Sequence, residues 1–178
     1  MSIQAEMNGM LVKRSDVVAY YGVPGEEGAV TYTRMQGFTE QAKSKNPIEY
    51  SRQYVDESFE RTDTTGYSTS MSFAFDRYKD NPVHEDMVQM ADSEATGSDT
   101  VREIVLVDFS NPVNEANRQY HAKKRAFTTI FDSEGNETNA YTYSGNFRAA
   151  GTTVSGTATV AADGRTLTFA AAAGNGGE

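Results

Sequence analysis

The chain contains no cysteine and no tryptophan, and only four of its 178 residues are proline. Without cysteine there is no disulfide and no thiolate metal site, so the fold must hold without covalent cross-links. Basic residues are also few, with 16 lysines and arginines against 25 aspartates and glutamates. The resulting formal charge of -9 argues against nonspecific binding to nucleic acid. No apolar run is long enough to span a bilayer, and the first residues lack the pattern of a signal peptide, so we expect no membrane segment.

Strand-forming residues dominate what the sequence does contain. Ten tyrosines, nine phenylalanines and abundant threonine favour β-structure. Alternating apolar and polar positions, separated by glycine, proline and asparagine, recur along the chain. At 178 residues we therefore expect a single domain over 1–178, mainly β, built as a β-sandwich or small barrel. The expected strands are 16–21, 30–35, 50–55, 65–75, 101–109, 120–131, 141–149, 152–161 and 166–170.

One segment changes from strand to helix periodicity. After the alternating run 65–75, Asn81 and Pro82 open a helix, because Asn81 can cap it and Pro82 suits its first position. We expect this helix to cover about residues 82–91 and to flank the sheet. Its apolar stripe should pack on the strand 101–109, and the stripe consists of Val83, Met87, Met90 and Ala91.

Catalytic and metal-binding patterns are weak. The two histidines lie on different predicted elements and have no ligand partners at suitable spacing. Asp56, Glu57 and Glu60 form an acidic cluster that a small hydrolase would use, but a solvated turn is the better interpretation without a nucleophile or pocket pattern. The segment 132–137 is read as a hairpin turn and not as a calcium loop. We expect no enzymatic activity, no cofactor and no metal.

Four segments are suited to contacts with other molecules. The segment 36–47 is polar and is predicted to be a loop, because it is too long for a tight hairpin. A flexible N-terminal arm (about 1–10) and a mobile C-terminal tail (171–178) are expected as well. In the basic run 123–125, strand alternation sends the first and third residues to one face and the second to the other. The contact candidates are Phe38, Glu40, Lys43, Lys45, Lys123 and Arg125.

The strand-to-helix segment TTGYSTSMSFAFDRYKDNPVHEDM resembles the major tail protein, or tail tube protein, of long-tailed, siphovirus-type bacteriophages of Gram-positive hosts. The similarity extends to the polar segment before Tyr50, to the apolar strand 101–109 and to the late meander KKRAFTTIFDSEGNETNAYTYSGNFRAAG. The resemblance implies a β-sandwich or small barrel with one flanking helix. The alternative from another functional class is a phage β-sandwich binding module, such as a capsid decoration or receptor-binding domain.

The resemblance also implies a structural function in the virion. Tail tube proteins form hexameric rings that self-assemble in the host cytoplasm around a tape-measure protein, and their other partners are tail terminator and distal tail proteins. Double-stranded DNA passes through the hollow tube without sticking, so Asp56, Glu57 and Glu60 are acidic lumen candidates here. Lys43 and Lys45 would pair with acidic residues of the next ring, whereas the run 123–125 would face an interface or the exterior. No catalytic residue and no membrane is implied.

Overall fold

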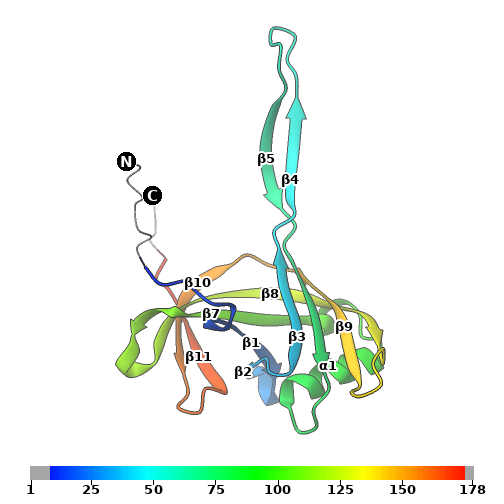
Figure 1. The fold of residues 1–178 in the computed structure, drawn as a ribbon, viewed down its shortest axis with the longest axis vertical. Helices are drawn as coiled ribbons and strands as arrows, with labels where there is room; N and C mark the ends of the chain where they lie inside the picture. Colours follow the sequence, from blue (N-terminus) through cyan, green and yellow to red (C-terminus); the bar gives the residue numbers. More distant parts are fainter. Residues whose placement is uncertain (1–8, 175–178) are drawn as a thin grey trace, which may run out of the picture.

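Strands make up most of residues 9–174, which are the residues that this computed structural model describes, and one α-helix accompanies them (Figure 1). The prediction of a mainly β fold with one helix is confirmed. The helix α1 covers Pro82–Asp92. The strands are β1 (Val17–Pro24), β2 (Val30–Arg34), β3 (Phe38–Ser44), β4 (Pro47–Arg52), β5 (Arg61–Tyr67), β6 (Ser70–Asp76), β7 (Val101–Asn114), β8 (Gln119–Glu134), β9 (Thr142–Ala149), β10 (Val154–Val160) and β11 (Thr166–Ala171).

Six strands close into a small barrel. Their order is β10-β11-β2-β1-β7-β8, and β10 pairs with β8 to complete the circle. Small or β-branched residues on β7, β8 and β10 let the narrow interior fill with side chains. The interior is a closed apolar core formed by Tyr20, Val105, Val107, Ala122, Ala158, Val160 and Leu167.

The strand β8 is longer than the barrel requires, and it continues into a second sheet. Beyond the barrel it pairs with β9, which is followed by β6 and β3 at the edge. One face of this sheet, α1 and the outer face of β1 and β7 enclose a second core. Aromatic rings dominate that core, and Phe73 and Phe147 pack with centroids 4.5 Å apart. Its buried members include Tyr21, Met71, Phe73, Phe75, Val83, Met87, Ile104, Phe127 and Phe147.

The helix begins as the sequence predicts and ends one residue later. The side chain of Asn81 accepts hydrogen bonds from the backbone N–H of Val83 (3.1 Å) and of His84 (3.4 Å). Val83, Met87 and Met90 are buried and Ala91 is partly buried, while Val88, outside the predicted stripe, is buried too. The helix lies mainly on β1, and the predicted partner strand contributes Ile104 to the same core.

The segment 65–75 is not one strand, as the sequence predicts, but two. The ladder breaks at residues 68 and 69, between β5 and β6. Asn46, with a φ of 45°, sits across the break: its carbonyl accepts from the N–H of Ser68 (2.9 Å) and its side-chain amide donates to the Ser68 carbonyl (2.9 Å). The segment that enters β4 and the segment that leaves β5 therefore depart from the body of the protein at the same point, and β4 and β5 form a separate hairpin (Figure 1).

The prediction that 36–47 is a loop is wrong. Most of this segment is the strand β3, which pairs antiparallel with β6 from Phe38 to Ser44. An edge strand needs few apolar residues because only one of its faces touches the core, and charged residues such as Lys43 are common there. The predicted N-terminal arm falls largely on residues 1–8, outside the described residues. The predicted C-terminal tail begins too early, because Ala171 still belongs to β11, where it pairs with Gly156, and residues 175–178 lie outside the described residues.

Candidate functional site

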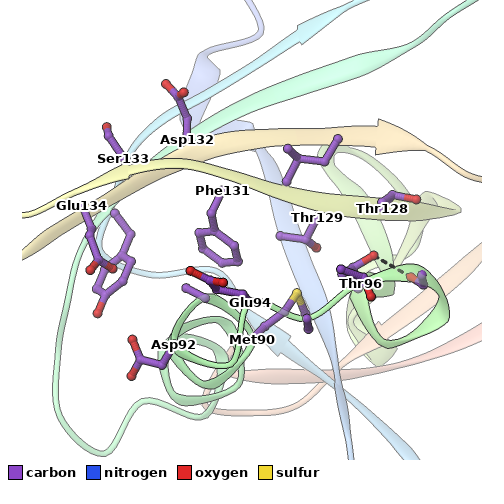
Figure 2. A pocket seen from close by; sticks show the side chains of 16 residues that line it. Met90, Asp92, Glu94, Thr96, Thr128, Thr129, Phe131, Asp132, Ser133 and Glu134 are labelled. Carbon is purple, nitrogen blue, oxygen red and sulfur yellow. Dashed lines mark hydrogen bonds between the residues drawn. The ribbon is translucent and has the colours of Figure 1, made fainter.

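The sheet β3-β6-β9-β8 has one face that the protein leaves uncovered. Strand alternation places small side chains on it, and none of them is buried. Charge is sparse on this surface, where Glu40, Asp76 and Arg148 are the charged residues at paired positions, and the bulge residue Asp132 points to the same side as Ser133 (Figure 2). We call it the free face, and its residues are Glu40, Ala42, Ser44, Ser70, Ser72, Ala74, Asp76, Thr128, Ile130, Ser133, Thr142, Ser144, Asn146 and Arg148.

The same sheet ends in two open strand edges. On one side β3 pairs with β6 alone among the described strands. On the other side β7 accompanies β8 only as far as Thr128, so residues 129–134 pair with β9 and have no strand on their opposite edge within 9–174. Each neighbouring pair in this sheet is antiparallel, so β3 and β8 run in opposite directions. Open edges expose unpaired N–H and C=O groups and favour pairing with another chain.

A groove of about 840 Å³ runs along the open edge of β8, between that edge and the end of α1 (Figure 2). Met90, Phe131 and Tyr143 give it an apolar floor. The hydroxyl of Thr129, a lining residue that is 3% exposed, has no hydrogen-bond partner among residues 9–174. The lining includes no lysine or arginine. Its charged residues are all acidic, and we call Asp92, Glu94, Asp132 and Glu134 the acidic rim.

Four cations gather at the other edge of the sheet, where β3 leads into the hairpin. The pKa of Lys43 is lowered, first because its side chain is partly shielded from water and then by the nearby charges of Lys45, Arg125 and Lys123. Arg125 donates to the carbonyl of Gly151 (2.6 Å), and no ion pair joins any of the four to a carboxylate within 9–174. The structure thus brings together four predicted contact residues, from β3, the residue that follows it and β8. We call Lys43, Lys45, Lys123 and Arg125 the basic cluster.

The hairpin β4–β5 projects from the body as an arm (Figure 1). A lone two-stranded hairpin is marginally stable in water, so this arm needs a partner surface. Large apolar side chains along it are exposed, and Val55 near the tip is fully so. The exposed set is Ile48, Tyr50, Tyr54, Val55, Phe59 and Tyr67. We refer to residues 47–67 as the arm.

The remaining predicted site residues fall in different places. Asp56, Glu57 and Glu60 lie in the connection at the tip of the arm, where Glu57 pairs with Arg61, and their assignment to a lumen stays a prediction. Phe38 packs inside its own chain, with its ring centroid 5.0 Å from that of Phe75.

Strand alternation separates Lys124 from the two basic residues beside it. It lies on the barrel side of β8, 3.2 Å from Glu103. The hydroxyl of Tyr32 donates to Glu103, and the Lys124 ammonium lies 5.3 Å from the centre of the Phe169 ring. Tyr32 and Phe169 also pack against the barrel core, so this group ties Lys124 to the barrel and not to the basic residues beside it.

The described residues hold neither a cluster of three metal-ligating side chains nor a helix long and apolar enough to cross a membrane. His84 is buried and its ring is used structurally. Its Nε2–H donates to the carbonyl of Gln36 (2.8 Å), and Nδ1 accepts from the N–H of Tyr78 (3.0 Å). Burial lowers the pKa of His84, so the ring is neutral at neutral pH.

Among solved structures, the chain is similar to one from a structure described as "Tail of empty GTA particle computed with helical refinement, C6 symmetry". The two share 15% sequence identity with a TM-score of 0.56, and the match covers 89% of this chain and 98% of the other. No known protein family matches the sequence, and no curated protein matches it. At this identity the likeness shows a shared fold: this protein has the fold of that chain from the particle's tail.

Proposed function

We propose that this protein is the structural subunit of a phage tail tube, in which copies join head to tail into rings and the rings stack into a hollow tube. The observation that carries the proposal is the pair of open edges on the antiparallel sheet β3-β6-β9-β8. The shared fold with a tail chain of C6 symmetry supports a closed ring of six copies. The sequence resemblance narrows the source to a long-tailed, siphovirus-type phage of a Gram-positive host.

The number and direction of the strands allow neighbouring copies to join through their open edges. With four strands in the sheet, β8 runs opposite to β3, so the β3 strand of the next copy would meet the 129–134 edge antiparallel. Such a join is heterologous, since the two edges differ. Repeating it gives a closed ring only if the rotation from one copy to the next is a whole fraction of a full turn. A closed ring would leave no free edge in this sheet, which removes the aggregation risk of an isolated subunit.

The free face is our candidate for the wall of the channel. Its small, mostly uncharged side chains would give a smooth surface, and Arg148 is its only cation. DNA binds proteins mainly through lysine and arginine contacts to phosphate, so a wall with few cations lets the duplex slide. The formal charge of -9 per chain adds repulsion. The acidic residues at the arm tip would act in the channel only if the arm lay along it.

The arm is our candidate for contact between stacked rings. It projects beyond the body, and its exposed apolar residues would be buried on a neighbouring subunit. In this arrangement the rings enclose a tape-measure protein, and terminator and distal tail proteins close the two ends. The protein would then be a virion component that is assembled in the host cytoplasm and has no catalytic function.

Electron microscopy of the purified protein tests the proposal. We expect six-fold rings or hollow tubes, whereas persistent monomers or trimers would contradict it and favour a decoration or receptor-binding module.

A variant without the arm separates ring formation from stacking. Pro47 and Tyr67 are paired across the base of the arm, so an Asn-Gly turn can replace residues 48–66. This variant should form rings but no tubes. Tubes of normal length from it would refute the stacking role of the arm. A matched control that changes only Val55→Ser should keep the hairpin and show a weaker defect.

A further inference from the structure

The two ends of the open sheet carry opposite charges, and neither charge is neutralised by a partner within the described chain. The acidic rim lines the groove at the β8 edge, and the basic cluster lies where β3 leads into the arm, with Lys123 and Arg125 contributed by the barrel part of β8. Among the described residues, the ion pairs are Arg61–Glu57, Arg102–Asp86 and Lys124–Glu103, which involve no residue of either group. Complementary patches of this kind steer association and exclude wrong partners.

Strand geometry determines where Lys43 would go in a joined sheet. On β3, Lys43 is opposite Met71, and Met71 belongs to the face that packs in the aromatic core. On β8, Thr129 is opposite the buried Phe147 and so points to that same side. Because faces continue across a sheet, a β3 strand added at the 129–134 edge would direct its Lys43 into the groove and not toward the free face.

The acidic rim lies where that lysine would arrive. Glu94 follows α1 with a φ of 50°, and its side chain lies between the end of the helix and β8, near Phe131 (Figure 2). The groove also holds the unpartnered hydroxyl of Thr129. A second chain seated in the groove would fill it, offer the Thr129 hydroxyl a partner and balance the charge of the acidic rim.

We propose that the acidic rim of one copy receives Lys43 of the next copy, with Lys45, Lys123 and Arg125 adding to the attraction, and that this match sets the head-to-tail direction of assembly. The inference rests on the proposed ring. Lys43 loses water when it is buried at the interface, and the carboxylate of Glu94 replaces that water with a charged partner. Like charges would meet if two copies joined edge to matching edge, so β3–β3 and β8–β8 joins are disfavoured.

Charge reversal tests the match. Lys43→Glu and Glu94→Lys should each keep the fold, because both side chains are exposed, and each should raise the protein concentration needed for assembly by roughly tenfold or more. Sedimentation measures the assembled fraction, and circular dichroism checks folding. Lys79→Glu is the matched control, since it is exposed, makes the same charge change outside both groups, and should assemble normally.

Mixing the two single variants gives the decisive measurement. In an alternating ring each groove would face a side chain of opposite charge, so an equal mixture should regain assembly at a protein concentration too low for either variant alone. The double variant Lys43→Glu/Glu94→Lys should recover as well. Two outcomes would overturn the match and leave the tube proposal intact. The single variants could assemble like the unaltered protein, or they could fold and fail to assemble, with no recovery in either the mixture or the double variant. Failure of the unaltered protein to form rings would refute the tube proposal itself.

Discussion

Replacing Asp86 with asparagine should destabilise the protein, because this residue ties α1 to the barrel. Arg102 on β7 donates to both carboxylate oxygens of Asp86, at 2.8 and 3.1 Å, and Tyr21 on β1 donates to the same carboxylate at 2.5 Å. Burial, and then the charge of Asp86, raises the pKa of Tyr21, so the phenol remains a donor. Asp86→Asn keeps the shape of the side chain and removes its charge, which leaves the Arg102 guanidinium without a counterion.

The exposure of the pair sets the size of the effect. The side chains of Arg102 and Asp86 are 17% and 14% exposed. Breaking a buried pair costs about 3–5 kcal/mol and an exposed pair contributes about 0–1 kcal/mol, so we expect a loss of about 2–3 kcal/mol at this exposure. For a domain of this size the loss lowers Tm by about 4–12 °C.

Urea unfolding followed by tyrosine fluorescence measures this loss, at a protein concentration where sedimentation detects no assembly, since assembly would add stability. Glu85→Gln, at the exposed neighbouring position, is the control and should cost less than about 0.5 kcal/mol. A cost below about 1 kcal/mol for Asp86→Asn would show that water screens the pair and would refute the reasoning.

Three further predictions concern the aromatic core. The pKa of His84 is lowered in the folded state and is about 6.5 in the unfolded state, so its contribution to stability is complete above pH 6.5 and falls as the pH drops below that value. His84→Gln should therefore lose less free energy of unfolding, measured in urea, between pH 7.5 and pH 5.5 than the unaltered protein does. Met87→Ala should cost about 2–5 kcal/mol in urea unfolding, because Met87 is fully buried and truncation leaves a cavity. Gly145→Ala should destabilise by at least about 1–3 kcal/mol in thermal melts, because its Cβ would lie 2.1 Å from the carbonyl oxygen of Ile130; a melt like that of the unaltered protein would contradict the close approach of β8 and β9.

Sequence patterns predicted the parts of the fold that depend on neighbouring residues. The cap at Asn81 and the apolar spacing from Val83 to Met90 located α1 to within one residue. The apolar run in 101–109 located β7, and the turn signals on either side of 120–131 located β8, although both strands extend further. The loop prediction at 36–47 failed because an edge strand gains its pairing from β6 and not from its own apolar residues.

The candidate site was only partly predictable. The sequence marked Lys43, Lys45, Lys123 and Arg125 as contact residues, but about eighty positions separate the two pairs and nothing in the spacing shows that they meet. The acidic rim was missed, because Glu94 and Asp132 belong to a turn and a strand that come together only when β8 passes the end of α1. Four acidic residues near predicted element ends were the only available signal.

By itself the sequence determined that this protein is a cysteine-free, acidic, mainly β domain with one helix, because composition and local periodicity fix how each short segment hydrogen-bonds and which of its faces is apolar. The tertiary structure decided that six strands close a barrel, that β8 continues into a sheet with two open edges, and that residues 47–67 leave the body as an arm. Those features depend on pairing between distant segments, where total burial and backbone hydrogen bonding choose among many registers that local sequence permits.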